Sequence, residues 1–258
     1  MFNDFRQRSY ELENIDRGTY TAEEYEACIP ELQRVNQWLG DARTLRHTLL
    51  REIQNRDLKQ FSVLDVGAGS GELLRVIATW ARSNARSVRL TGLELNATSA
   101  SSVVEKSREF PEINSVRATG FQLPFADGQF DYVLSSLFTH HFTDSQVVEL
   151  LVEMQRVASR GICVIDLHRH PIAYYFYTTI GHLILHSRLL REDGALSIRR
   201  SFTADELLAL AKSAGLEKAR VERHFPYRLA LLAPTSPADV DSISGTGRDL
   251  KSAPSKAA

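Results

Sequence analysis

Residues 63–71 read Val63-Leu-Asp-Val-Gly-Ala-Gly-Ser-Gly71, an apolar run that ends in three glycines at alternate positions before a helical pattern begins at Glu72. Glycine adopts the positive φ angles of a tight turn and leaves main-chain N–H groups open to a ligand. The dinucleotide fingerprint G-x-G-x-x-G would need its third glycine at position 72. The spacing therefore predicts a strand, a nucleotide-cradling turn and a helix, and it disfavours a nicotinamide dinucleotide as the ligand.

Two later segments extend this pattern. Residues 89–94 form a short apolar run that ends in Glu94, where a doubly wound fold places a carboxylate against ribose hydroxyls. Residues 123–133 read Leu-Pro-Phe-Ala-Asp-Gly-Gln-Phe-Asp-Tyr-Val. The glycine turn resembles motif I, (D/E)-x-G-x-G-x-G, of the class I S-adenosylmethionine-dependent methyltransferases. The 123–133 segment resembles L-P-F-x-D-x-x-F-D-x-V of the small-molecule (type 11 or 12) branch of that family.

This resemblance implies that S-adenosyl-L-methionine is the cofactor. Relatives usually carry an Asp-Ala pair where this chain has Thr119 and Gly120. A threonine hydroxyl accepts a hydrogen bond but supplies no charge, so we expect adenine recognition to depend on Phe121 and on backbone groups. The cofactor-binding residues that the resemblance implies are Asp65, Gly67, Ala68, Gly69, Gly71, Glu94, Leu95, Thr119, Gly120, Phe121, Ser135 and Ser136.

Strand patterns alternate with helical patterns through the middle of the chain, which predicts a parallel sheet with right-handed crossovers. The resemblance implies an α/β fold, a doubly wound, Rossmann-like sheet of seven mostly parallel strands with an antiparallel last strand and an N-terminal helical lid. We divide the chain into a lid segment (1–56), a methyltransferase domain (57–233) and a disordered tail (234–258). The expected strands are 61–66, 88–93, 114–118, 130–135, 161–167, 218–224 and 227–232, and the expected helices of the domain are 71–82, 97–109, 144–158, 172–186 and 203–214.

Helix signals also precede the first strand. Thr21 and Glu24 form a capping box, and Pro30 stands where a new helix can begin. In the family such helices cover cofactor and substrate, and we expect 33–40 to reach the site. The charged stretch 188–200 is expected to be a loop. The aromatic run 174–177 has two interpretations, core packing or the wall of an apolar pocket.

Composition excludes several classes of function. The 31 Lys and Arg nearly balance 32 Asp and Glu, for a formal net charge of −1, so no field attracts polyanions and we expect no nucleic-acid partner. The N-terminus lacks the apolar run of a secretory signal, and 172–185 is too short for an integral membrane segment. The two cysteines, Cys28 and Cys163, fit a reducing compartment, which favours a cytoplasmic location. The oligomeric state is left open.

The carboxyl ends of the strands form the mouth where ligands bind in open α/β sheets. Four histidines are expected to gather there: His140, His141, His168 and His170. A phenolic acceptor must lose a proton, and imidazole titrates in the range that suits this task. We take His141 as the best candidate for the base, with His140 and His168 as further catalytic candidates, and we expect only one of the adjacent pair to face the pocket.

A metal is not expected. Imidazoles together with Asp166 could ligate a divalent cation, but no spacing such as H-E-x-x-H is present. The function that follows is methyl transfer from S-adenosylmethionine to oxygen or carbon of a small hydrophobic metabolite, phenolic, polyketide or quinone-type. Two alternatives stay open: a catalytically silent cofactor-binding module in a complex, and a protein or RNA methyltransferase.

Overall fold

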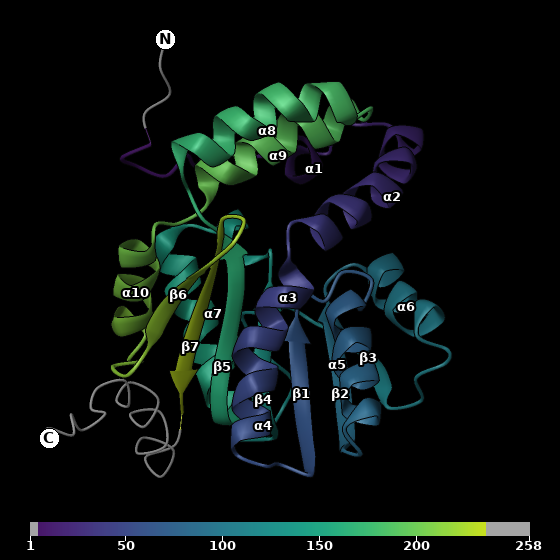
Figure 1. The fold of residues 1–258 in the computed structure, drawn as a ribbon, viewed down its shortest axis with the longest axis vertical. Coiled ribbons are helices and arrows are strands. Elements are labelled where there is room, and N and C mark those ends of the chain that lie inside the picture. The colour runs from purple at the N-terminus through teal and green to yellow at the C-terminus, as the bar shows by residue number, and fades with distance from the viewer. Residues whose placement is uncertain (1–4, 236–258) are drawn as a thin grey trace, which may run out of the picture.

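The computed structural model describes residues 5–235, which form a seven-stranded sheet with helices on both faces and further helices above one edge (Figure 1). The strand order is β3-β2-β1-β4-β5-β7-β6, and only β7 runs antiparallel to its neighbours. This confirms the predicted α/β fold. The strands are β1 (Gln60–Val66), β2 (Ser87–Glu94), β3 (Ile113–Arg117), β4 (Phe130–Ser136), β5 (Ala158–Leu167), β6 (Arg220–His224) and β7 (Arg228–Pro234).

The central strands are apolar on both sides because helices cover both faces of the sheet. Along β1, Phe61 and Val63 pack into one hydrophobic cluster, whereas Leu64 and Val66 pack into another on the opposite face. The first cluster lies against η1 (Arg46–Leu50), α4 (Arg51–Asn55), α5 (Glu72–Ser83) and α6 (Ala97–Lys106). The second lies against α7 (Asp144–Val157) and α10 (Ala204–Ser213). The sheet is thereby fixed as a platform for the loops at its edge.

A layer of helices lies over the carboxyl ends of the parallel strands, at the top of Figure 1. Two of these helices precede the sheet in sequence and two follow β5, so the layer is built from distant parts of the chain. The outer helix α8 packs on α9, and α9 also contacts α1 and α2. The layer consists of α1 (Asn14–Arg17), α2 (Ala22–Trp38), α8 (Pro171–Ile184) and α9 (Arg188–Arg200), whereas α3 (Asp41–Leu45) continues into η1 and packs against the sheet.

Two predictions about these helices were wrong. Pro30 starts no helix, because α2 begins at the Thr21 capping box and continues through the proline. The stretch 188–200 is no loop but α9, capped by the Ser187 hydroxyl. Its pattern misleads because the buried side of α9 carries Asp193 and Arg200 among its leucines. Charged residues on a buried face hide the apolar period by which a helix is recognised.

The chain beyond the sheet lies mostly outside the described residues. Strand β7 extends to Pro234, and the N–H of Thr235 donates to the carbonyl of Arg160 at 3.0 Å. The predicted tail therefore begins later than position 234, and its residues 236–258 lie beyond the described part. Within residues 5–235, we find no helix with the length and apolarity needed to cross a membrane.

Candidate active site

The glycine turn follows β1 as the spacing predicts. Gly67, Gly69 and Gly71 take φ angles of 76°, 58° and 74°, a region that favours glycine. A Cβ atom on Gly67 would lie 2.6 Å from the ring of Phe138, so this glycine is required by packing. A Cβ on Gly69 would have no neighbour within 4 Å. Gly69 is therefore the position at which the turn is open to a ligand.

Two carboxyl groups flank the turn. Asp65, the last residue but one of β1, is buried, and its Oδ1 has no hydrogen-bond partner. Burial raises the pKa of Asp65 to about 8, and the nearby Glu94 adds to the shift. Glu94 ends β2 and accepts a hydrogen bond from the N–H of Gly69, while burial raises its pKa. An unpartnered buried carboxyl suits a ligand that brings a positive group or a hydrogen-bond donor.

The remaining predicted cofactor residues surround this turn or lie behind it. Ala68 belongs to the turn, Leu95 is exposed after β2, and Ser136 ends β4 half-buried. Thr119 accepts a hydrogen bond from the N–H of Phe121 at 3.3 Å, and a Cβ on Gly120 would touch Leu150 at 3.0 Å. The ring of Phe121 meets that of Phe142 edge-on. Ser135 is fully buried, and its hydroxyl donates to the carbonyl of Val66 at 2.9 Å, so its part is structural.

A cavity of about 300 Å³ lies between the sheet edge and the helical layer. Leu137, which follows β4 with a positive φ of 50°, brings the chain from the predicted cofactor site to this cavity. Most of the cavity wall is apolar and comes from α2, α9 and the start of α1. Val35 and Leu39 line it, and both belong to the segment 33–40 that was expected to reach the site. One end is polar. The other lining residues are Glu13, Ile15, Cys28, Leu32, His140, His141, Leu167, Tyr177, Leu189, Leu190, Asp193, Gly194, Ser197, Ile198 and Arg228.

His140 is held at the polar end by Asp166. Its Nδ1 lies 2.6 Å from the Asp166 carboxylate, which also accepts hydrogen bonds from the hydroxyl of Thr139 and the N–H of His140. Burial alone would raise the pKa of Asp166, but His140 and these donors lower it to about 2. Because a carboxylate only accepts, Nδ1 of His140 carries a hydrogen. Nε2 faces Glu13 at 3.9 Å.

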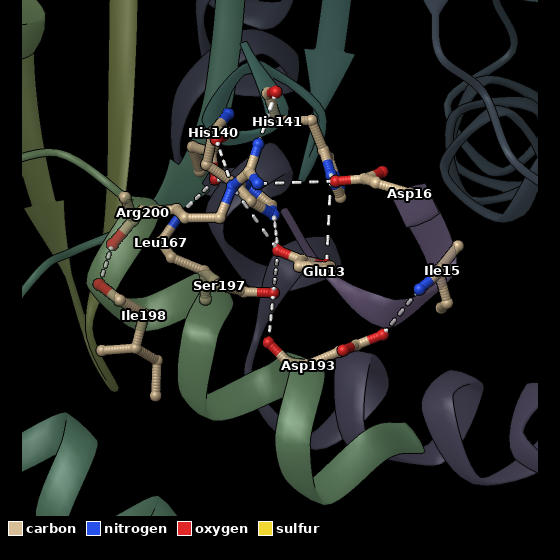
Figure 2. Close-up of polar contacts among 12 residues, drawn as sticks. Glu13, Ile15, Asp16, His140, His141, Leu167, Asp193, Ser197, Ile198 and Arg200 are labelled. Carbon is tan, nitrogen blue, oxygen red and sulfur yellow. Dashed lines mark hydrogen bonds and ion pairs between the residues drawn. The ribbon is translucent and has the colours of Figure 1, made fainter. Parts of the chain in front are cut away.

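His141 lines the same cavity, which corrects the expectation that only one of the pair would face it. The two rings lie 4.3 Å apart between centroids at 33°. The Nδ1 of His141 lies 3.3 Å from Asp16 and 4.0 Å from Glu13 (Figure 2). Burial raises the pKa of Glu13. Burial also acts to raise that of Asp16, but the hydrogen bond and charge of His141 outweigh it, so the pKa of Asp16 is lowered.

Charged residues of the helical layer fasten the N-terminal segment 5–17 over this site. Arg200 donates to the carbonyls of His140, His141 and Glu11. Asp193 accepts hydrogen bonds from the N–H groups of Asn14 and Ile15 at 2.8 and 3.1 Å. This contact positions the segment that carries Glu13 and Asp16.

His168 and His170 do not join the other two histidines, contrary to the expectation of four at one mouth. Their rings lie 5.7 Å apart and both pack near Tyr227, and neither residue lines the cavity. Burial lowers the pKa of His168, and the nearby Arg223 adds to the effect. His168 lies elsewhere because its N–H bonds to the carbonyl of Tyr227, which turns the chain toward the β6–β7 hairpin.

The aromatic run 174–177 was expected either to pack in the core or to form the wall of an apolar pocket, and its residues differ in this respect. Tyr177 lines the cavity, and its hydroxyl donates to the carbonyl of Leu190. Tyr174 and Tyr175 instead contact Phe5, while Phe176 is 63% exposed. Only one of the four therefore serves as a pocket wall.

Sequence reasoning missed Glu13 and Asp16. They lie in a short polar segment about 120 residues before the histidines, and no motif marks them.

Comparison with known proteins agrees with this geometry. Residues 64–165 match the family model described as a methyltransferase domain. The chain is 25% identical over 190 residues to the ubiquinone/menaquinone biosynthesis C-methyltransferase UbiE of Rickettsia felis, covering 67% of this chain and 75% of that protein. Among solved structures, the CurJ carbon methyltransferase matches with a TM-score of 0.63 at 12% identity, covering 86% of this chain and 63% of that one. Magnesium protoporphyrin IX methyltransferase from Synechocystis PCC 6803 matches with a TM-score of 0.55 at 15% identity, covering 77% and 84%.

Residues 64–165 carry a methyltransferase domain by this family match, and the fold and the glycine turn are those expected of the class I S-adenosylmethionine-dependent methyltransferases. The residues present fit the cofactor of that class. The unpartnered Oδ1 of buried Asp65 and the open space above Gly69 are the two features of this structure that such a ligand would use.

Proposed function

We propose that the protein methylates oxygen or carbon of a small hydrophobic metabolite, phenolic, polyketide or quinone-type, and does so in the cytoplasm. The observation that carries the proposal is the cavity between the sheet edge and the helical layer, apolar along its walls and polar at the end formed by Glu13, His140 and His141. Pockets that are mostly apolar with a few convergent polar groups are typical of sites for small organic molecules.

In this proposal the glycine turn and the two strand ends hold the cofactor. Gly69 leaves room for it, Asp65 offers its free oxygen, and Glu94 is the candidate for the ribose hydroxyls. S-adenosylmethionine supplies an electrophilic methyl group when bound. The protein then has to align the acceptor and exclude water, which an enclosed cavity does.

The polar end of the cavity is proposed to act on the reacting atom of the acceptor. His140 and His141 are the residues that reach it, and the position of His168 outside the cavity removes it from this role. A cavity of about 300 Å³ accommodates one ring system with short substituents rather than a folded peptide or a nucleotide chain. The size therefore favours a small molecule over protein or RNA.

The proposal is tested by mass spectrometry of the purified protein with S-adenosylmethionine and a panel of phenols, quinols and β-dicarbonyl compounds. Methylated product is expected for at least one. A Val35→Trp variant should lose product formation, because an indole fills the cavity, and should keep cofactor affinity within about twofold. Cofactor binding without product from any acceptor, including an extract of the host, would favour the catalytically silent module.

A further inference from the structure

Three potential metal ligands meet at the polar end of the cavity. A carboxylate oxygen of Glu13, a ring nitrogen of His140 and a ring nitrogen of His141 all lie within 4.8 Å of one another. Glu13 and His140 are 3% and 4% exposed. Figure 2 shows the Glu13 carboxylate facing both imidazole rings. The three come from two segments that the fold brings together, so their convergence is no consequence of sequence proximity.

The distances within this cluster are too long for hydrogen bonds. The Glu13 carboxylate lies 3.9 Å from Nε2 of His140 and 4.0 Å from Nδ1 of His141, whereas an N–H···O bond spans about 2.7–3.2 Å. Because Asp166 occupies Nδ1 of His140, it is Nε2 that faces Glu13 and is available as a ligand atom. The spacing between this nitrogen and the carboxylate leaves room for an ion between them.

Several carboxylates converge on the two imidazole rings. Asp166 bonds to His140, and Asp16 and Glu13 lie 3.3 and 4.0 Å from Nδ1 of His141. Carboxylate oxygens and imidazole nitrogens are donors that divalent transition metals take.

We propose that Glu13, His140 and His141 form a binding site for a divalent transition-metal cation. Two imidazole nitrogens and a carboxylate suit zinc, iron or manganese. Ligands about 2.0–2.2 Å from a tetrahedral zinc lie roughly 3.3–3.5 Å apart, so the 3.9 and 4.0 Å distances need to close by about half an ångström. Asp16 lies at hydrogen-bond distance, 3.3 Å, from Nδ1 of His141 and is not one of the three converging ligand groups.

The surroundings of the ligands resemble those of metal sites. Metal-bound histidines commonly donate their second N–H to a carboxylate, which fixes the tautomer, and Asp166 receives that hydrogen from His140 at 2.6 Å. The hydroxyl of Ser197 donates to Glu13 at 2.8 Å and restrains its rotamer. The hydrogen bonds from His140 to Asp166 and from Ser197 to Glu13 are buried or half-buried, and both are present in the structure without an ion.

This inference rests on the proposed function and narrows its substrate class. The three ligands line the acceptor cavity, so a cation held by them would face the acceptor. The compounds that suit such a site carry an oxygen at or next to the methylated atom, as phenols, enols and quinols do, and hydrocarbons or thioethers do not.

The test uses untagged full-length protein stripped of metal by a chelator. Calorimetric titration with zinc is expected to show one tight site, and cobalt is expected to give the visible absorption of a low-coordinate complex. Glu13→Gln and His141→Gln should each weaken zinc binding by 100-fold or more. The matched control is His168→Gln/His170→Gln, which removes the second histidine pair of the described residues and should leave the zinc titration unchanged.

Thermal melting and S-adenosylmethionine affinity are measured on every variant, to exclude unfolding and to keep this test separate from that of the proposed function. No zinc binding by a folded protein that still binds S-adenosylmethionine would overturn the metal site alone. Zinc binding that Glu13→Gln and His141→Gln leave unchanged would overturn it as well, because the ion would then sit elsewhere. A wild-type protein that does not bind S-adenosylmethionine would overturn the proposed function instead.

Discussion

Asp65 links cofactor binding to stability. Its pKa rises from the ordinary value of about 3.9 to about 8 in the fold. The folded protein therefore binds the proton of the Asp65 carboxyl more tightly than the unfolded chain does. This proton binding contributes its full stabilisation of the fold below pH 4, and the contribution is lost as the pH rises through 8. Asp65→Asn keeps the site neutral at all pH values. Without cofactor, the variant should exceed wild type at pH 9 by about 2 kcal/mol or more.

Urea unfolding at pH 6 and pH 9 measures this difference, which should be smaller at the lower pH. The same variant should bind S-adenosylmethionine at least tenfold more weakly, because a neutral amide replaces a carboxyl that the ligand can ionise. An equal stability difference at both pH values would contradict a raised pKa at Asp65.

Two glycines of the turn allow a matched comparison. Gly69→Ala places a Cβ in open space, so the folded protein should lose only the roughly 1–2 kcal/mol that a left-handed residue costs. Its cofactor affinity should fall at least tenfold. Gly67→Ala drives a Cβ into Phe138 at 2.6 Å, so it should lose considerably more stability. Thermal melting measures the stability of both variants, and calorimetry measures their cofactor affinity. Similar losses of stability would contradict the absence of neighbouring atoms around a Cβ at Gly69.

At this scale, the sequence predicts residues whose role is local. Gly69 and Glu94 belong to a short motif in which backbone conformation and spacing determine the function, and the structure places them together. Glu13 reaches the cavity only because α9 and the 139–141 turn hold its segment in place. No pattern along the chain encodes such a contact, so it could not be predicted.

Helix α9 fixes the N-terminal segment, and this can be tested through one carboxylate. Asp193 binds the first N–H groups of α1, which carries Asp16 and follows Glu13. Asp193→Ala should lower kcat/KM for the acceptor by at least tenfold, because Glu13 and Asp16 are no longer held beside the histidines. Cofactor affinity should stay within about twofold. Arg191→Ala, two positions earlier on α9, is the control, because its guanidinium donates to the carbonyl of His186, and turnover should stay close to wild type.

The end of the sheet gives a second test at the level of elements. Truncation after Thr235 removes residues whose composition cannot bury apolar surface, so melting temperature and cofactor affinity should be unchanged. Truncation after Ala233 also removes the last pairing of β7 with β5 and the bond from Thr235 to Arg160. It should lower the melting temperature by a few degrees. Equal effects of the two truncations would show that this strand end contributes nothing.

Whether a helix or strand could be predicted from the sequence depends on whether apolar packing stabilises it. Strands such as β4 and helices such as α7 have apolar residues at regular periods and were predicted to within a few residues. Helix α9 was not, because Asp193, Ser197 and Arg200 stand on the side that packs against the site. These polar residues stand where apolar residues would have given α9 a helical period. The sequence of α9 therefore looks like that of a charged loop.

At the scale of the molecule, the sheet and the helical layer are stabilised separately. Both large hydrophobic clusters lie against the sheet, and among the side chains that the structure describes neither includes a buried residue of α1, α2, α8 or α9. The layer instead encloses a cavity and is joined to the sheet largely through polar contacts such as those of Arg200 and Arg228. Regions with few buried apolar contacts open locally at lower free energy than the core.

Hydrogen exchange followed by mass spectrometry should therefore show two classes of amides. Those of α2, α8 and α9 should exchange well before those of β1, β4 and β5, whose ladders lie between the two clusters. A methyl acceptor that fills the cavity contacts α2 and α9 from within, so it should slow exchange in the layer and leave the sheet amides unchanged. Cofactor alone should protect the glycine turn first. Simultaneous exchange of layer and sheet would mean that the two unfold as one unit, and the cavity would then open only when the whole domain does.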